Sequence, residues 1–168
     1  MLCDMLASHP TLACPHEYLD TNEENANWRA ALDALAAKTG KKAIGHVQAK
    51  YATDEMLNDP DTRRLLLFRD PRKSALSFLR VSHERPGWTL DPVDFRAEVN
   101  KREAAYKRLR PFADAVVTYE ELTNGENTLE APEPVATRLC GFFGVPVIAL
   151  RTMIRKNQPS FPTNWKDL

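Results

Sequence analysis

The segment LLLFRDPRKSALSFLR, which ends at Arg80, constrains the fold of this chain more than any other part of the sequence. Arg64 to Phe68 is a short, strongly apolar run, typical of a strand that is buried on both faces of a parallel sheet. Asp70-Pro71 follows at once. Asp is a favoured N-cap and Pro is favoured at the first helical position, so we predict a helix from there to about Arg80. A buried strand therefore leads directly into a helix.

Strand and helix signals alternate along the rest of the chain as well. Helices are predicted from the first residues to His9-Pro10, from the Thr21–Glu24 capping box to Gly40, from Asp91-Pro92 to Arg110, and from Pro134 to Phe143 before Gly144. Extended segments are predicted over Thr11 to Tyr18, Ala43 to Gln48 and Ala115 to Thr118. This order predicts a single α/β domain with a mostly parallel sheet flanked by helices. Ligands bind such sheets at the carboxyl ends of the strands.

The charge balance and the cysteine positions limit what the chain could bind and where it could be found. Lys plus Arg and Asp plus Glu number 23 each, so the chain as a whole has no attraction for nucleic acid or for an anionic membrane. An anion site must then be a local cluster. No apolar run approaches the length of a membrane span. Three cysteines without a CxxC pair argue against a disulfide framework or a zinc site, and we expect a cytoplasmic protein without a metal.

A local cluster of this kind follows the apolar run. Arg69 is the first residue past the predicted strand and should stand at the ligand edge of the sheet. Lys73 and Ser77 are four residues apart in the helix that follows, so they share a face. Two cations and a hydroxyl near a helix N-terminus suit a phosphate group. The alternative interpretation is a solvated basic helix face.

These residues carry a resemblance to a known family. Arg-Asp-Pro-Arg after a buried strand, with a Ser eight residues past the first Arg, resembles the 3′-phosphate-binding segment of sulfotransferases. Those enzymes use 3′-phosphoadenosine 5′-phosphosulfate (PAPS) as the sulfate donor. The resemblance implies that Arg69 and Ser77 hold the 3′-phosphate. VVTYEELTNG resembles the family's strand that ends in Tyr-Glu-Asp-Leu, which implies that Tyr119 lies near the adenine. Alternatively, Tyr119 is a half-buried aromatic residue at a strand end.

Both ends of the chain extend the resemblance. Ile154 to Leu168 resembles the family's C-terminal loop, which implies that Arg155 and Lys156 add charge on the 3′-phosphate; the alternative is a basic tail. MLCDMLASHPTLACPHEYL resembles the helix that follows the phosphosulfate loop and the Pro-x-Glu-Tyr segment of the bacterial branch. No glycine-rich loop precedes that helix, and GxxxxGK[ST] does not occur. The resemblance therefore implies, over residues 1–168, a P-loop-NTPase-like sulfotransferase fold that lacks its first strand and its phosphosulfate loop.

The implied reaction is transfer of a sulfuryl group to an acceptor hydroxyl or amine of a small molecule, a carbohydrate or a lipid. Glu17 is the first candidate for the base that takes the acceptor proton, by its match to the Pro-x-Glu-Tyr segment. His46 is the second, and His16 is a third; Lys50 is a candidate for orienting the acceptor. Because the donor loop is absent, an inactive sulfotransferase-like binding or scaffold protein is the alternative function. A kinase-like fold is disfavoured, since the sequence has no Walker loop.

Overall fold

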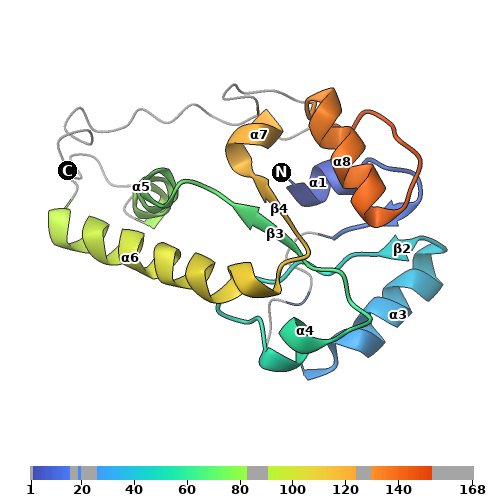
Figure 1. The fold of residues 1–168 in the computed structure, drawn as a ribbon, viewed down its shortest axis with the longest axis horizontal. Helices are drawn as coiled ribbons and strands as arrows, with labels where there is room; N and C mark the ends of the chain where they lie inside the picture. Colours follow the sequence, from blue (N-terminus) through green and yellow to red (C-terminus); the bar gives the residue numbers. More distant parts are fainter. Residues whose placement is uncertain (1, 16–18, 20–25, 83–90, 124–129, 153–168) are drawn as a thin grey trace.

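Two parallel strands, β3 (Leu65–Phe68) and β4 (Ala115–Thr118), lie at the centre of the fold in this computed structural model (Figure 1). The structure describes residues 2–15, 19, 26–82, 91–123 and 130–152. The pairing runs from Leu65 opposite Ala115 to Phe68 opposite Thr118, so both strands end at the same level. Both predicted strands are confirmed, and β3 begins one residue later than the predicted run.

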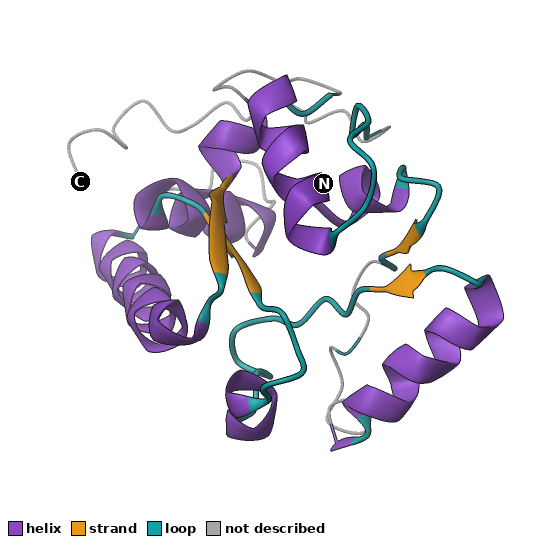
Figure 2. Ribbon diagram, turned by 45° about the vertical axis from the view of Figure 1, so that its right-hand side comes forward, coloured by secondary structure: helices purple, strands orange, loops and turns teal. Residues whose placement is uncertain are grey.

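A second parallel pair joins β1 (Leu12–Ala13) to β2 (Lys42–Ala43). Figure 2 shows the two pairs as separate sheets. The fold is therefore α/β with parallel pairing, but the described residues form two short sheets rather than the one sheet that we predicted. The predicted strand over Ala43 to Gln48 is wrong in extent. Its pairing ends with Ile44, whose N–H donates to the carbonyl of Ala13, because β1 itself is only two residues long.

The helices follow their capping signals. Asp91 caps α6 by accepting from the N–H groups of Val93 and Asp94, and Gly40 and Gly144 end their helices in the left-handed conformation at φ 64° and 63°. The Thr21–Glu24 capping box lies outside the described residues. The helices are α1 (Leu2–Ala7), α3 (Trp28–Thr39), α4 (Asp54–Asn58), α5 (Pro71–Ser82), α6 (Pro92–Leu109), the 3-10 turn η1 (Arg110–Phe112), α7 (Tyr119–Thr123) and α8 (Glu133–Phe143). Of these, α4, η1 and α7 were not predicted.

Helices pack on both sides of the β3–β4 pair. In Figure 1, α5 and α6 lie to one side and α1 and α8 to the other. The α5–α6 side holds a small cluster of Ala75, Leu76, Leu79 and Phe95, and the ring of Phe68 in β3 lies 4.2 Å from that of Tyr106 in α6. The larger cluster includes buried residues of α1, β1, β4, α7 and α8. The predicted covering of the sheet on both faces is confirmed for this pair.

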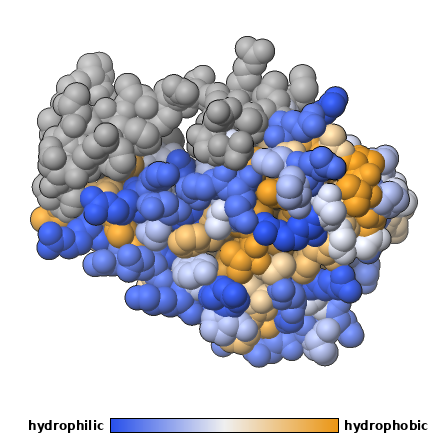
Figure 3. Space-filling model, turned by 45° about the horizontal axis from the view of Figure 1, so that its top comes forward, coloured by the Kyte–Doolittle hydropathy of each residue, from blue (hydrophilic) through white to orange (hydrophobic). Residues whose placement is uncertain are grey.

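The described residues expose few large hydrophobic side chains. Figure 3 shows a mostly hydrophilic face, with hydrophobic side chains in smaller groups between charged ones. The large hydrophobic side chains that are exposed come from four separate elements or loops: Leu67, Phe78, Val93 and Val147. Within the described residues, none of the helices combines the length and the hydropathy that crossing a bilayer requires.

Candidate functional site

The candidate site lies where β3 and β4 end. Since Phe68 is paired with Thr118, the next residues, Arg69 and Tyr119, leave neighbouring strands side by side. The guanidinium carbon of Arg69 lies 4.7 Å from the centre of the Tyr119 ring, which is a cation–π contact. Sequence reasoning assigned both residues to one nucleotide site, and the structure brings these two together.

The position of Tyr119 is fixed by a capping box that turns β4 into α7. The Thr118 N–H donates to Oε2 of Glu121 at 2.7 Å, and the Glu121 N–H donates to Oγ1 of Thr118 at 3.1 Å. The hydrogen bond from the Thr118 backbone holds the pKa of Glu121 below its ordinary value, because it stabilises the carboxylate. Tyr119 is therefore the first residue of a capped helix rather than a loose strand end.

The turn that carries Arg69 is fixed in a similar way by Asp70. Its carboxylate accepts from the Lys73 N–H at 3.0 Å, and its carbonyl accepts from the Ser74 N–H at 2.9 Å. This confirms the predicted start of α5 at Asp70-Pro71. The Nε atom of Arg69 is buried and makes no hydrogen bond within the residues that the structure describes. A buried donor of this kind is costly unless an acceptor reaches it.

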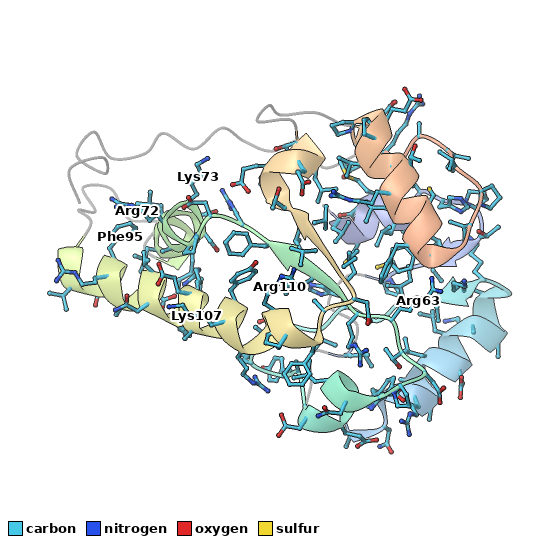
Figure 4. All side chains as sticks on the ribbon, in the orientation of Figure 1. Arg63, Arg72, Lys73, Phe95, Lys107 and Arg110 are labelled. Atoms are coloured by element: carbon cyan, nitrogen blue, oxygen red, sulfur yellow. The ribbon has the colours of Figure 1, made fainter. Side chains whose placement is uncertain are left out.

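Charged side chains of α5 and α7 meet near this point. In Figure 4, Arg72 and Lys73 project from α5. Lys73 Nζ lies 3.9 Å from a carboxylate oxygen of Glu120 in α7, and Arg72 lies 5.8 Å from the centre of the Phe95 ring. Arg72 therefore contacts α6, while Arg69 and Lys73 against Asp70 and Glu120 give the site a formal charge of two minus two, or zero.

These surroundings change the pKa of the Tyr119 hydroxyl. Burial raises the pKa of Tyr119 above its ordinary value; the Arg69 charge lowers it and the Glu120 charge raises it. The phenol therefore stays protonated at neutral pH and keeps a donor proton.

Ser77 has a less direct relation to the site. It lies one helical turn beyond Lys73 on the same face of α5 and is partly buried. Among the hydrogen bonds of the described residues, none joins its hydroxyl to Arg69. Arg69 and Lys73 thus lie at the start of α5 and Ser77 in its middle, while the contact that forms is between Arg69 and Tyr119.

Of the candidate bases and the residue proposed to orient the acceptor, the structure describes His46 and Lys50. His46 is partly buried three residues past β2, which belongs to the other strand pair. Lys50 lies with its Nζ 4.4 Å from the ring centre of its neighbour Tyr51. The remaining predicted residues, His16, Glu17, Arg155 and Lys156, lie outside the described residues.

Sequence reasoning missed two features of the site. The first is the capping box, although Thr-x-x-Glu at residues 118–121 is the pattern that identifies one. The second is Glu120, whose approach to Lys73 depends on how α5 and α7 meet and has no signal in the sequence.

Histidine, cysteine, aspartate and glutamate side chains form no group of three or more that could hold a metal ion, within the residues described. Comparisons of the chain with models of known protein families, with curated proteins and with solved structures found no match.

Proposed function

We propose that this chain is a sulfotransferase-like domain of P-loop-NTPase-like fold that binds PAPS by its 3′-phosphate at the carboxyl ends of β3 and β4. The observation that carries the proposal is the contact of Arg69 with Tyr119. It places a guanidinium and an aromatic ring together where parallel strands end, which is where ligands bind in such sheets.

The residues at this point fit a phosphate group. The buried Nε of Arg69 is a donor that lacks an acceptor in the described residues, and a guanidinium presents several donors in a fork that matches phosphate oxygens. Lys73 adds a second charge at the first turn of α5, whose dipole also favours an anion. The Asp70 carboxylate accepts a hydrogen bond in the cap of α5, so Glu120 is the carboxylate that would repel an anion here.

The chemistry divides between the donor and the chain. When bound, PAPS supplies an activated sulfuryl group for an acceptor hydroxyl or amine. Arg69 and Lys73 hold the 3′-phosphate and so orient the nucleotide, while the Tyr119 ring offers a flat surface to the base. Ser77, Arg155 and Lys156 add contacts to the same phosphate, and Glu17 or His46 takes the acceptor proton. The acceptor is a small molecule, a carbohydrate or a lipid, and we place the protein in the cytoplasm.

A binding protein without activity is the second candidate. It is favoured by the chemistry of the contacts around Arg69, since a guanidinium, a phenol and an ammonium group can bind an anion without carrying out a transfer. An assay for transfer of labelled sulfate from PAPS to a panel of phenols, amines and sugars separates the two. Transfer by the purified chain that is lost in Arg69→Ala identifies the enzyme, whereas nucleotide binding without transfer identifies the binding protein.

Calorimetric titration with adenosine 3′,5′-bisphosphate tests the site itself. We expect the wild type to bind, and Arg69→Ala to bind at least about tenfold more weakly, because a charged hydrogen bond contributes roughly 1.5–3 kcal/mol. Adenosine 5′-monophosphate, which lacks the 3′-phosphate, should bind weakly to both proteins.

Arg110→Ala is the matched control. Arg110, labelled in Figure 4, is an exposed arginine that precedes β4; because β3 and β4 are parallel, it lies at the opposite end of the strands from Arg69. Its removal should leave the affinity unchanged. If Arg69→Ala binds the bisphosphate as tightly as Arg110→Ala does, the assigned site is wrong.

A further inference from the structure

Three carboxylates follow the ends of β3 and β4 in sequence, and two of them take part in the caps of the next helices. Asp70 accepts from the Lys73 N–H at 3.0 Å at the start of α5. Glu121 accepts from the Thr118 N–H at 2.7 Å and from the Arg138 guanidinium of α8 at 3.0 Å. Both carboxylates thus hold the turns that lead from strand to helix.

The third carboxylate, Glu120, makes a longer contact. Its Oε1 lies 3.9 Å from Nζ of Lys73, which is longer than a charged hydrogen bond, and its side chain is 36% exposed. The Lys73 side chain is 50% exposed. An ion pair between groups that water reaches contributes little, because water screens it. Glu120 can therefore exchange this contact for one with a ligand at a small cost.

Glu120 lies beside the cations to which we assign the 3′-phosphate. It directly follows Tyr119 in α7, and the Tyr119 ring lies 4.7 Å from the Arg69 guanidinium carbon. A carboxylate at this position repels the phosphate and lowers the affinity of the site. Glu120 therefore weakens nucleotide binding unless the nucleotide also carries a hydrogen-bond donor for this carboxylate.

The ribose of the nucleotide carries such a donor. Its 2′-hydroxyl is on the carbon next to the one that bears the 3′-phosphate, so an acceptor beside the phosphate-binding cations can accept its hydrogen bond. In dinucleotide-binding α/β folds, an Asp or Glu residue binds a ribose hydroxyl in this way. We propose that Glu120 accepts from the 2′-hydroxyl and makes the site selective for ribonucleotide 3′-phosphates. The selectivity rests on the proposed function, since it requires that Arg69 and Lys73 hold the 3′-phosphate.

The same carboxylate acts against two related ligands. A 2′-deoxyribonucleotide keeps the repulsion between its phosphate and Glu120 but lacks the hydroxyl that offsets it. A nucleotide with a 2′-phosphate places an anion where the hydroxyl would lie, so Glu120 repels it more strongly. Selectivity thus comes from a favourable contact with one ligand and from unfavourable contacts with the others.

Calorimetric titration of the whole wild-type chain with three nucleotides tests this role. We expect adenosine 3′,5′-bisphosphate to bind at least about tenfold more tightly than 2′-deoxyadenosine 3′,5′-bisphosphate, because a hydrogen bond to a charged group contributes at least that factor. Adenosine 2′,5′-bisphosphate should also bind more weakly than the 3′,5′-isomer.

Substitution of Glu120 should change the ratio of the two affinities. Glu120→Ala should bind the ribose and deoxyribose forms equally, and should bind the deoxyribose form more tightly than the wild type does, since the repulsion is gone. Glu120→Gln keeps an acceptor oxygen without the charge and should retain part of the preference. A purely structural role of Glu120 would change both affinities by the same factor and leave their ratio unaltered.

Glu55→Ala is the matched control. Glu55 is an exposed residue of α4, which lies at the amino end of β3, where Arg64 donates to the carbonyl of Leu57 in the same helix. Its removal takes away the same charge at the opposite end of the strand from Glu120. The ratio of the two affinities should stay at the wild-type value.

The possible outcomes distinguish a wrong role for Glu120 from a wrong site. A wild type that binds the ribose and deoxyribose forms equally tightly overturns the role of Glu120 and leaves the 3′-phosphate site in place. A preference that persists in Glu120→Ala also overturns it, since another group would then bind the hydroxyl. A wild type that binds neither form overturns the proposed function and the selectivity with it. The wild-type comparison needs no variant, so it decides even if a variant fails to fold.

Discussion

At the scale of single residues, His9 shows how a polar side chain can be fully enclosed. Its Nδ1 faces the Thr11 N–H at 3.2 Å and the Thr11 hydroxyl at 3.0 Å, and its Nε2 faces the carbonyl of Pro146 at 2.9 Å. A backbone N–H can only donate, so Nδ1 accepts and Nε2 carries the proton that it donates to Pro146. The ring therefore joins the start of β1 to the segment after α8.

We expect His9→Ala to lower the free energy of unfolding by about 2–4 kcal/mol. The change leaves the Thr11 N–H and the Pro146 carbonyl unpaired in the core and opens a cavity, since His9 is 1% exposed. Urea denaturation followed by circular dichroism measures the loss. His9→Gln keeps one hydrogen-bonding group and should lose less; an alanine variant within about 0.5 kcal/mol of the wild type would contradict this account.

The site illustrates what residue types alone can predict. Arg69 was predicted because it follows an apolar strand, and Tyr119 because its segment resembles the Tyr-Glu-Asp-Leu strand of sulfotransferases; the two meet where the paired strands end. The ion pair of Lys73 with Glu120 could not be predicted, because it joins two helices whose relative position the sequence pattern does not encode. His46 lies three residues past β2, outside both strand pairs, and its role as a base stays a prediction.

At the scale of elements, long helices with caps were predictable and short elements were not. α5, α6 and α8 begin at a proline or one residue before it, and their capping residues are visible in the sequence. α4 and α7 have five residues each, too few for an apolar period to appear. For α7 the capping box was the only readable signal, and it overlaps the end of β4.

Thr118→Val tests that capping box. Valine keeps the shape of threonine but removes the hydroxyl that accepts from the Glu121 N–H, so we expect α7 to lose about 1 kcal/mol of stability. Hydrogen exchange of the α7 amides measures the effect locally, and exchange should accelerate there more than in α8. Thr137→Val, at an exposed position of α8, is the control. Equal exchange of α7 in both variants would mean that the hydroxyl does not hold the helix.

At the scale of the whole molecule, side chains connect elements that a single sheet would have connected through its backbone. Arg63 donates to the carbonyl of Phe142 at 2.6 Å, and Arg108 donates to that of Ala52 at 2.7 Å. The first bond joins the segment before β3 to α8, and the second joins α6 to the segment before α4. The sequence predicted one continuous sheet because it reports the order of the elements, whereas the pairing depends on strand lengths that here reach only two to four residues.

The strongest of these connections is Arg64 with Asp114, at the amino ends of β3 and β4. The Arg64 backbone N–H donates to Oδ2 of Asp114 at 2.6 Å and its guanidinium lies 3.2 Å from Oδ1, while Nη1 donates to the carbonyls of Leu57 and Asp59 at 2.8 Å and 2.9 Å. The hydrogen bonds from the Arg64 side chain and backbone hold the pKa of Asp114 below its ordinary value. A carboxyl with a lowered folded-state pKa adds stability above its unfolded pKa of about 3.9, and that contribution is lost as pH falls through the folded value.

We therefore expect Asp114→Asn to be less stable than the wild type at pH 7 by about 1 kcal/mol, a modest figure because the Asp114 side chain is 40% exposed and water screens the pair. The difference should begin to shrink as the pH falls below about 4, where the carboxyl of the unfolded chain takes up a proton, and should be lost once the folded carboxyl is protonated as well. Urea denaturation at a series of pH values measures both effects. Asp33→Asn, at an exposed position of α3, removes the same charge without touching Arg64 and should show neither. A gap between Asp114→Asn and the wild type that stays constant down to acid pH would show that packing, and not the ionised pair, joins the two strands at this end.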